Sequence, residues 1–248
     1  LMQGNYYGIS ILKKTDGKWV FSHKIKGFDY SSKHFAVTNK SEVYISHEYK
    51  GIFSFKLDDQ LKEVTTFFRY KYPDKGKNSC LVQFNNTIYY AYKEGVFRLD
   101  KSSKSFVKDT ILSKVFQNDK YTSGKLISDN SNKLWLFSKN YIHYFTINKL
   151  NNKLKEFAIP IPASLTNSML GYENISQLSN SNYLIGTADG YYTINLNDLS
   201  IKNYSLSITN ITMNKLNDKQ IFCSIVDDGV FKHDENNLVF SYCIPEYN

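Results

Sequence analysis

The sequence has few of the residues that mark a nucleic-acid-binding protein. Arg69 and Arg98 are its only arginines, so lysine carries nearly all of the formal net charge of +8. Proteins that bind nucleic acid usually recruit arginine for bidentate contacts to phosphates and bases. The lysines here are scattered, with short clusters at Lys13–Lys14 and at 71–77. We therefore expect a solvated lysine-rich surface and no direct nucleic-acid binding by this region.

Cysteine and histidine are also sparse. Cys80, Cys223 and Cys243 show no C-x-x-C spacing, and their odd number leaves at least one thiol unpaired. We expect buried free thiols, with a Cys223–Cys243 bridge as the alternative in an oxidising compartment. The five histidines lie singly along the chain, without H-x-H or H-E-x-x-H spacing. The sequence therefore predicts no metal site, and we expect no cofactor.

Long hydrophobic runs and a signal-peptide pattern are absent as well. No apolar run approaches the length of a transmembrane helix. The chain begins at Leu1 rather than Met, which indicates a processed or excised portion of a longer protein. Any membrane attachment is therefore expected from a segment outside this sequence. Only 4 prolines and 12 glycines exclude a low-complexity or collagen-like chain, whereas 20 tyrosines and 17 phenylalanines suit half-buried pleated sheets.

What the sequence does contain is an internal repeat. Its clearest copy is Leu184–Asn195, which reads as a strand, an Asp-Gly turn and a second strand. Weaker copies share the turn at spacings of 43, 44, 45, 50 and 39 residues. Gly and Asn tolerate positive φ, so we expect one backbone conformation to recur six times. The six turn residues are Gly8, Gly51, Gly95, Asn140, Gly190 and Gly229.

Each repeat unit contains four short apolar runs separated by polar turns. Phe35–Val37 and Val43–Ser46 precede the turn at Gly51, for example, and two further runs follow it. The unit is therefore a four-stranded antiparallel meander of about 44 residues, which is typical of a β-propeller blade. No segment shows a convincing 3.6-residue apolar period, so we expect an all-β fold with very little helix. A stacked solenoid and a β-sandwich are the alternatives, and the regular spacing with four strands per unit argues against them.

The predicted propeller region covers the whole of 1–248 but does not divide into whole blades. Residues 1–26 supply only a third and a fourth strand, and five full units follow. Open sheet edges invite pairing with other chains. We therefore expect either an incomplete portion of a larger propeller or an irregular six-bladed ring, and we favour the first. The predicted blades are 1–26 (partial), 33–70, 78–118, 122–160, 170–206 and 207–242.

Two stretches carry a resemblance to a known repeat. Leu126–Phe137 resembles the "I-x-x-D-x-x-G-N-L-W-I-G-T" half of the two-component-regulator propeller repeat, and Ile185–Tyr192 resembles the following "I-G-T-x-x-G-L-Y" half. Departures are visible, because Asn132-Lys133 replaces the motif's Gly-Asn. These repeats form the periplasmic sensor region of bacterial hybrid two-component systems. They also occur in related regulators that carry a triple-tyrosine domain and a helix-turn-helix.

The resemblance implies a sensor that detects a ligand, often a glycan fragment, and passes on a conformational change. It implies a periplasmic location, or a cytoplasmic one if the parent is a soluble regulator. It also implies a homodimer formed through the full-length chain. A kinase, a helix-turn-helix or nothing further could follow this region.

Candidate catalytic residues are hard to find. Asp189 and the pair Asp227–Asp228 invite a calcium or acid–base interpretation, but Asp beside Gly also satisfies turn geometry, and we favour that interpretation. A sialidase-type box, S-x-D-x-G-x-T-W, laid on Ser128–Trp135 finds Asn130 where Asp is needed. No G-x-S-x-G trace of a nucleophile elbow exists either. We therefore predict no catalytic residue.

The candidate binding residues are those in loops that should share one face of the propeller. These are the turns between second and third strands and the connections between blades. Aromatic rings can stack on the apolar face of a sugar, and neighbouring charges can take its hydroxyl or carboxylate groups. Ordinary solvated loops are the alternative. The predicted ligand-binding residues are Tyr49, Lys50, Tyr72, Tyr92, Lys93, Glu94, Lys139, Asp189, Asp227 and Asp228.

The function expected from these observations is a non-enzymatic, ligand-sensing propeller region whose ligand is a small molecule or an oligosaccharide. A propeller lyase or glycosidase is one alternative, and it would need clustered acidic or histidine side chains at the mouth of the ring. A protein-interaction scaffold is the other, and it would present an exposed aromatic face without a pocket.

Overall fold

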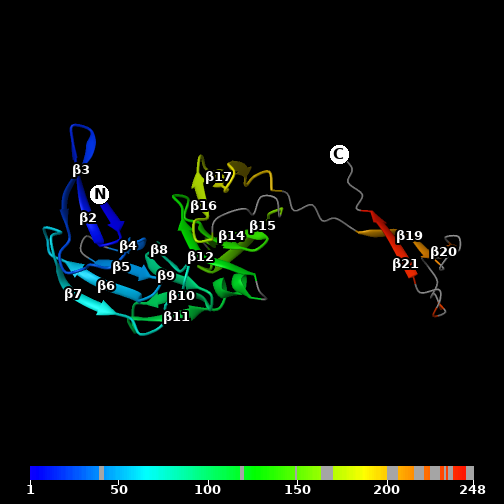
Figure 1. Ribbon diagram of the computed structural model, residues 1–248, viewed down its shortest axis with the longest axis horizontal. Coiled ribbons are helices and arrows are strands. Elements are labelled where there is room, and N and C mark those ends of the chain that lie inside the picture. Colours follow the sequence, from blue (N-terminus) through cyan, green and yellow to red (C-terminus); the bar gives the residue numbers. More distant parts are fainter. Residues whose placement is uncertain are drawn as a thin grey trace. The chain divides into compact units, whose positions relative to one another are not determined.

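The fold is described from a computed structural model (Figure 1). The structure describes residues 1–38, 42–117, 120–148, 150–162, 170–199, 206–214, 221–223, 230–231, 233 and 237–243. The chain divides into two compact units, Leu1–Asp198 and Leu199–Asn248. Strands and turns make up nearly all of the described residues, and the helical element among them is the short 3₁₀ helix η1 (Leu112–Phe116). The fold is all-β, as the sequence predicts.

The first unit consists of five antiparallel sheets that follow one another along the chain. The second, third and fourth sheets are four-stranded meanders, and the first and fifth have three described strands. The first sheet contains β1 (Met2–Asn5), β2 (Gly8–Thr15) and β3 (Lys18–Lys24). The second contains β4 (His34–Val37), β5 (Glu42–His47), β6 (Gly51–Leu57) and β7 (Val64–Arg69).

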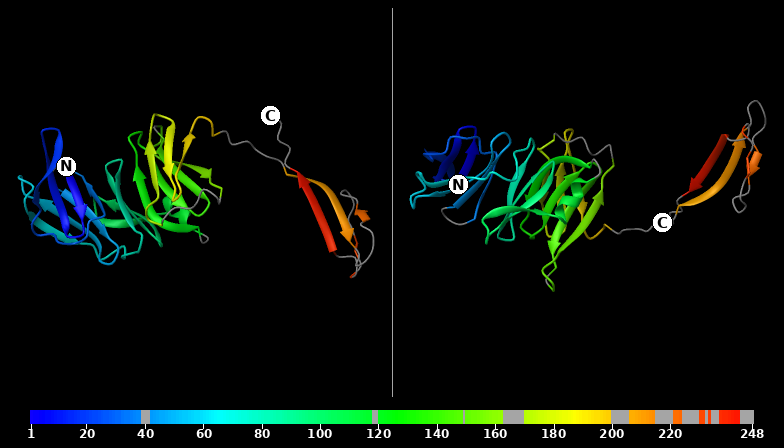
Figure 2. Two further views of the ribbon diagram at one scale, coloured as in Figure 1. Left: turned by 45° about the horizontal axis from the view of Figure 1, so that its top comes forward. Right: turned by 90° about the horizontal axis from the view of Figure 1, so that it is seen from below.

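The remaining strands of the first unit continue this series (Figure 2). The third sheet contains β8 (Cys80–Phe84), β9 (Thr87–Tyr92), β10 (Gly95–Asp100) and β11 (Ser105–Asp109). The fourth contains β12 (Tyr121–Ser128), β13 (Leu134–Ser138), β14 (Tyr141–Ile147) and β15 (Leu154–Pro160). The fifth contains β16 (Asn174–Gln177), β17 (Asn182–Gly186) and β18 (Tyr191–Asn195).

The central strands are buried on both faces. Successive residues of a strand point to opposite sides of its sheet. In β5, however, Val43, Tyr44 and Ile45 are all buried. Each face of the second sheet must therefore pack against a neighbouring sheet. This explains why the central strands read as nearly continuous hydrophobic runs rather than as alternating ones.

Four hydrophobic clusters fill the spaces between successive sheets. Val43 and Ile45 pack with Ile9 and Ile11 of the first sheet, whereas Tyr44 belongs to a cluster with Tyr90 of the third. Further clusters join the third sheet to the fourth and the fourth to the fifth. The first strand of the third sheet, β8, also contacts the first strands β4 and β12 of its neighbours. Face-to-face sheets whose first strands meet are the propeller-like arrangement that the repeat predicts.

The repeated turn conformation is only partly as predicted. Gly8, Gly51 and Gly95 have φ values of 120°, 88° and 133°, and Gly190 has 159°. Asn140 is not among the residues with positive φ, so its predicted left-handed conformation is wrong. The register explains this, because the residue of the fourth sheet that corresponds to Gly95 is Tyr141 and not Asn140. Tyr141 pairs with Ser138 just as Gly95 pairs with Tyr92. The fourth sheet therefore places an ordinary strand residue where the first three sheets have glycine.

The first sheet has one strand more than predicted for residues 1–26. β1 pairs with β2 from Met2↔Ile11 to Asn5↔Gly8, ahead of the two strands predicted there. In the blade predicted at 170–206, residues 200–205 lie outside the described residues, so its fourth strand stays a prediction. Within the described part of the chain, no helix is long and apolar enough to cross a membrane.

The second unit has a different strand order. β19 (Ser207–Asn214) lies between β20 (Ile221–Cys223) and β21 (Asn237–Cys243) and pairs with both. A meander would place the first strand of the blade predicted at 207–242 at one edge of the sheet, so the predicted order is wrong for these three strands. Of the strand predicted after Gly229, the residues Val230, Phe231 and His233 are described, and none of them lies in a strand. The assignment of 207–242 to a last blade of a single region therefore stays a prediction.

The cysteines are unpaired, and only one of them is fully buried. Cys80, on β8, is buried in the first unit, whereas Cys243 is exposed on β21. Cys223 and Cys243 pair with different residues of β19, from opposite sides. The Cys223–Cys243 bridge kept as an alternative does not form, and the expectation of buried free thiols is correct only for Cys80.

Candidate functional site

One end of each sheet collects the loops in which the sequence predicts a binding site. In an antiparallel meander, the turn between the second and third strands lies at the same end as the start of the first strand. We call this end of the first unit the loop face. Tyr49, Lys50, Lys93, Glu94, Lys139 and Asp189 all lie in or beside its turns. Asp227 and Asp228 lie outside the described residues.

A cavity of about 410 Å³ opens on the loop face. Lys50 comes to it from the β5–β6 turn, and the connection between the second and third sheets supplies its other charged residues. We call it the cationic cavity, because four cationic side chains and a single carboxylate line it. These residues are Lys50, Arg69, Lys71, Lys75 and Asp74.

Aromatic and backbone contacts hold the cationic cavity in shape. The Nζ atom of Lys50 lies 4.0 Å from the centroid of the Tyr30 ring, which stacks in turn on Phe53 at 5.2 Å. The guanidinium Nε of Arg69 donates a 3.0 Å hydrogen bond to the carbonyl of Lys50. Cation–π contacts and a charge-assisted hydrogen bond therefore fix both cations before any ligand arrives.

The connection that forms the far wall is anchored by Tyr90. Its hydroxyl donates a 3.1 Å hydrogen bond to the carbonyl of Asp74, and the Asp74 carboxylate accepts one from the amide of Lys75. Burial raises the pKa of Tyr90 to about 12, so the hydroxyl stays protonated and able to donate. This wall is consequently a fixed part of the scaffold.

The three predicted tyrosines occupy different environments. Tyr49 and Tyr72 are 67% and 56% exposed, so their rings are available to a ligand. Tyr72 packs edge-to-face on Phe97 at 5.4 Å but does not line the cationic cavity. Tyr92 is 1% exposed, so its ring is not available for stacking. Its hydroxyl donates a 2.9 Å hydrogen bond to Glu94, which places Glu94 beside the β9–β10 turn together with Lys93.

A second, smaller cavity of about 70 Å³ lies between the fourth and fifth sheets and includes Lys139. Glu173, which the sequence analysis does not single out, also lines it. Glu173 is only 5% exposed, and its Oε2 atom accepts a 2.8 Å hydrogen bond from the amide of Gly171. Its Oε1 atom is buried and has no hydrogen-bond partner within the described part of the chain. An unpartnered buried carboxylate oxygen is costly, so this oxygen is a candidate hydrogen-bond acceptor for a ligand.

Tyr121, at the start of β12, packs against the hydrophobic cluster between the third and fourth sheets. Its hydroxyl is likewise buried without a partner among the described residues. Burial first, and then the nearby charges of Tyr90 and Glu173, raise the pKa of Tyr121. The sequence signal for Glu173 is weak: it is an acidic residue beside Tyr172 in a connection between blades, the same composition as the connection around Tyr72.

Asp189 has a purely local setting. The amide of Thr187 bonds the carbonyl of Gly190 at 2.9 Å, which closes the exposed turn around Asp189. Asp189 lines neither loop-face cavity. Over the described ranges, no group of three or more His, Cys, Asp or Glu side chains is placed to hold a metal ion.

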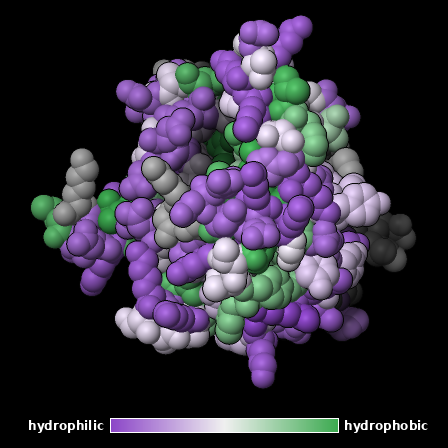
Figure 3. All heavy atoms as spheres, turned by 90° about the vertical axis from the view of Figure 1, so that its left-hand side faces the viewer, coloured by the Kyte–Doolittle hydropathy of each residue, from purple (hydrophilic) through white to green (hydrophobic). Residues whose placement is uncertain are grey.

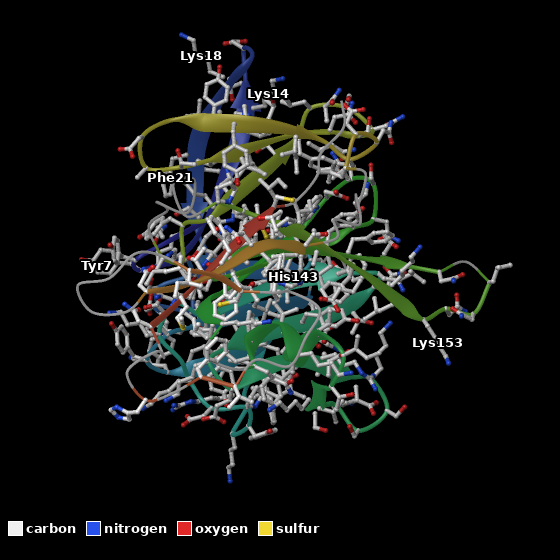
Figure 4. All side chains as sticks on the ribbon, turned by 90° about the vertical axis from the view of Figure 1, so that its right-hand side faces the viewer. Tyr7, Lys14, Lys18, Phe21, His143 and Lys153 are labelled. Atoms are coloured by element: carbon white, nitrogen blue, oxygen red, sulfur yellow. The ribbon has the colours of Figure 1, made fainter. Side chains whose placement is uncertain are left out.

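A hydroxyl–imidazole–carboxylate chain crosses the fourth sheet. His143 Nε2 lies 3.0 Å from Ser138 Oγ, and His143 Nδ1 lies 2.9 Å from Glu156 Oε1 (His143 is labelled in Figure 4). Burial lowers the pKa of His143, and the Glu156 carboxylate opposes that effect. Nucleophilic catalysis would also need oxyanion donors and an accessible hydroxyl. Ser138 is only 7% exposed and also lies within hydrogen-bond distance of the Tyr141 carbonyl, so we regard the chain as a link between strands.

Comparison with solved structures finds similar folds. One is the "extracellular domain of the putative hybrid two component system BT3049" from B. thetaiotaomicron, with a TM-score of 0.52 and 18% identity. That match covers 88% of this chain and 28% of the other. Another is the corresponding domain of BT4673 from the same organism, with a TM-score of 0.50 and 12% identity, covering 96% of this chain and 39% of the other.

The chain therefore spans less than half the length of these two similar structures. No family model matches the chain, and no curated protein matches it in sequence. The likeness is one of fold, and it agrees with the resemblance seen in Leu126–Phe137. In fold, this chain is similar to the extracellular domains of hybrid two-component systems.

Proposed function

We propose that this chain is the ligand-sensing propeller portion of a bacterial two-component sensor or related transcription regulator. In this proposal, a ligand binds the loop face, and its binding energy favours one arrangement of the sheets. The remainder of the protein transmits this conformational change. The location is periplasmic, and the signalling form is a homodimer formed through the full-length protein. The region itself performs no catalysis.

The cationic cavity carries this proposal. Lys50 and the 69–75 connection are far apart in the sequence, yet they line one cavity of about 410 Å³. That volume is within the range typical of small-ligand sites. The fold similarity to extracellular domains of hybrid two-component systems supports a sensor role for such a site.

The charge of the cavity selects the ligand class. Four cationic side chains face one carboxylate, and the Asp74 carboxylate is already bound to a backbone amide. The exposed rings of Tyr49 and Tyr72 lie on neighbouring parts of the loop face. Cations take carboxylate groups, and aromatic rings stack on the apolar faces of sugars. We therefore propose an acidic oligosaccharide as the ligand.

Isothermal titration calorimetry on the 248-residue chain tests this proposal. The probes are a uronic-acid oligosaccharide and the same oligosaccharide with its carboxyl groups reduced. We expect only the acidic form to bind well, and we expect Lys71→Gln with Lys75→Gln to weaken it at least about tenfold. The matched control is Lys14→Gln with Lys18→Gln, which removes the same charge from the exposed β2–β3 hairpin (Figure 4). Equal binding of both probes, or no binding, contradicts the proposal.

A protein-interaction scaffold is the second candidate, and one observation favours it. Trp19, Val20 and Phe21 on β3 are 54%, 50% and 62% exposed. The side of the molecule that carries β3 and β7 is mostly hydrophilic and has separate hydrophobic patches (Figure 3). Contiguous exposed aromatic residues are typical of interaction surfaces. If Trp19→Ser with Phe21→Ser abolished signalling by the full-length protein while oligosaccharide binding was unchanged, the scaffold function would be favoured.

A further inference from the structure

A third cavity, larger than the two on the loop face, lies between the second and third sheets. Its volume is about 670 Å³, and it extends from Tyr70 to Asn86 and Lys104. Asn86 lies in the β8–β9 turn and Lys104 in the β10–β11 turn. Both turns are at the end of the third sheet opposite to the loop face. We call this cavity the inter-sheet groove.

The groove exists because one row of side chains in the second sheet has a small residue at its centre. Cross-strand partners share a face of a sheet, so Tyr44, Ser54 and Phe68 form one row across β5, β6 and β7. The matching row in the fourth sheet is Trp135, Tyr144 and Phe157. There, Tyr144 packs against Trp135 in a tilted arrangement, with ring centroids 4.9 Å apart, and stacks on Phe157 at 4.6 Å. Ser54 takes the position of Tyr144, and the space that a ring fills in the fourth sheet is open in the second.

The walls of the groove are aromatic and aliphatic. Tyr70 packs edge-to-face on Phe68, with ring centroids 4.8 Å apart, and its ring lies 6.5 Å from that of Tyr44. Ile88 and Leu99 of the third sheet line the opposite side. Two facing apolar walls suit a flat ring, and the volume is within the range of small-molecule pockets.

Three lysines at the rim give the groove its charge. Lys56, Lys101 and Lys104 line it, and none of them forms an ion pair with another described residue. The two carboxylates that line the groove already accept hydrogen bonds from the protein. Glu42 accepts hydrogen bonds from the hydroxyls of Thr38 and Tyr44, and Asp100 accepts them from the amides of the β10–β11 turn. Three lysines against two carboxylates therefore leave the groove with a net positive charge.

We propose that the inter-sheet groove binds a small organic anion that carries a flat apolar ring, such as an aromatic carboxylate. The ring enters the space beside Ser54, between Phe68 and Tyr70 on one side and Leu99 on the other. The carboxylate meets Lys101 and Lys104 at the rim. This site shares the Tyr70 wall with the cationic cavity but is otherwise lined by different residues, and it takes a different ligand class from the oligosaccharide proposed there.

Calorimetry with 2-naphthoate, 2-naphthalenemethanol and 2-naphthylmethylamine tests the site on the 248-residue chain. We expect 2-naphthoate to bind at least about tenfold more tightly than the neutral alcohol, and the amine not to bind. Lys101→Gln with Lys104→Gln is expected to remove that preference while leaving the weak binding of the alcohol. Raising the ionic strength is expected to weaken 2-naphthoate alone. Equal affinity for all three probes would overturn the proposal.

Filling the groove is the second arm of the test. Ser54→Tyr restores the row found in the fourth sheet and is expected to abolish binding of both 2-naphthoate and the alcohol. Ser54→Ile is a smaller filling change in case the tyrosine variant unfolds, and circular dichroism verifies both. Lys14→Gln with Lys18→Gln is the matched charge control and should bind 2-naphthoate like the wild type. Undiminished binding by a folded Ser54 variant, or equal loss in the charge control, would show that the probe binds elsewhere.

Discussion

Asp129 accepts, through Oδ2, a 2.9 Å hydrogen bond from the indole Nε1 of Trp135. The same oxygen accepts a 2.8 Å hydrogen bond from the hydroxyl of Tyr183 in the fifth sheet. Its other oxygen, Oδ1, accepts the amides of Ser131 and Lys133 and so closes the β12–β13 turn. One carboxylate therefore orders a turn, satisfies a fully buried indole and joins two sheets.

The first prediction is that Asp129→Ala is strongly destabilising. It leaves the buried Trp135 Nε1 without its acceptor and removes the link to Tyr183, and each unsatisfied buried polar group costs about 1–3 kcal/mol. We expect the free energy of unfolding to fall by about 2–4 kcal/mol in urea denaturation. Asp189→Ala is the control, because Asp189 is exposed, and it should change stability by less than about 0.5 kcal/mol. Equal effects of the two changes would contradict this account of Asp129.

This contact also explains why the four-stranded order could be predicted from the sequence. Asp129 and Trp135 are the Asp and Trp of the propeller-repeat motif, so the motif encodes a hydrogen bond between a turn and a buried ring. Asn132 stands where the motif has glycine, and its φ is 58°. Asn tolerates this left-handed conformation better than other non-glycine residues. The departure in sequence therefore preserves the backbone, and the four-stranded order survives a degenerate motif.

The second prediction concerns close packing between the third and fourth sheets. The amide of Gly124 donates a 2.9 Å hydrogen bond to the carbonyl of Asn78, and a Cβ at Gly124 would overlap the backbone carbonyl of Ala91. A backbone obstacle cannot rotate away, so Gly124→Ala must separate β12 from β9. We expect a loss of about 1–3 kcal/mol, measured by thermal and urea denaturation. Gly186→Ala is the matched control, because nothing lies within 4 Å of a Cβ there.

The third prediction concerns His34, a partly buried residue on β4. Burial, followed by the charges of Lys125 and Lys33, lowers the pKa of His34 to about 3. The unfolded chain has an ordinary histidine pKa of about 6.5, so between pH 6.5 and 3 the unfolded state binds more protons. Stability is therefore full above pH 6.5 and falls as the pH decreases. We expect His34 to account for about 2 kcal/mol of lost stability between pH 7 and pH 5.

His34→Gln separates this contribution from those of other titrating groups. The variant cannot take up the proton, so its unfolding free energy should fall less steeply between pH 7 and pH 5 than that of the wild type. Urea denaturation at half-unit pH steps measures both slopes. Parallel curves for the two proteins would show that His34 does not titrate in this range.

The features that the sequence did not predict depend on contacts between distant residues. The burial of Glu173 follows from packing between the fourth and fifth sheets, and nothing in its own neighbourhood signals it. The strand at Met2–Asn5 lacks hydrophobic alternation and is set by pairing with β2. Asn140 does not have the positive φ predicted for it, because Tyr141 is the residue that pairs in the fourth sheet as Gly95 does in the third. Lys50 and Lys139 could be placed on the loop face from the repeat alone, but which loops enclose a cavity could not.

The last prediction concerns Tyr70, which lines both the cationic cavity and the inter-sheet groove. Its ring packs on Tyr44 and Phe68 on the groove side and on Phe106 at 5.0 Å. Tyr70→Ala removes a wall that the two sites share, so we expect both the uronic-acid oligosaccharide and 2-naphthoate to bind at least about fivefold more weakly. Tyr72→Ala is the comparison, because Tyr72 is exposed and lines neither cavity. It should leave 2-naphthoate binding unchanged. If Tyr70→Ala weakened only one of the two ligands, the wall would belong functionally to that site alone.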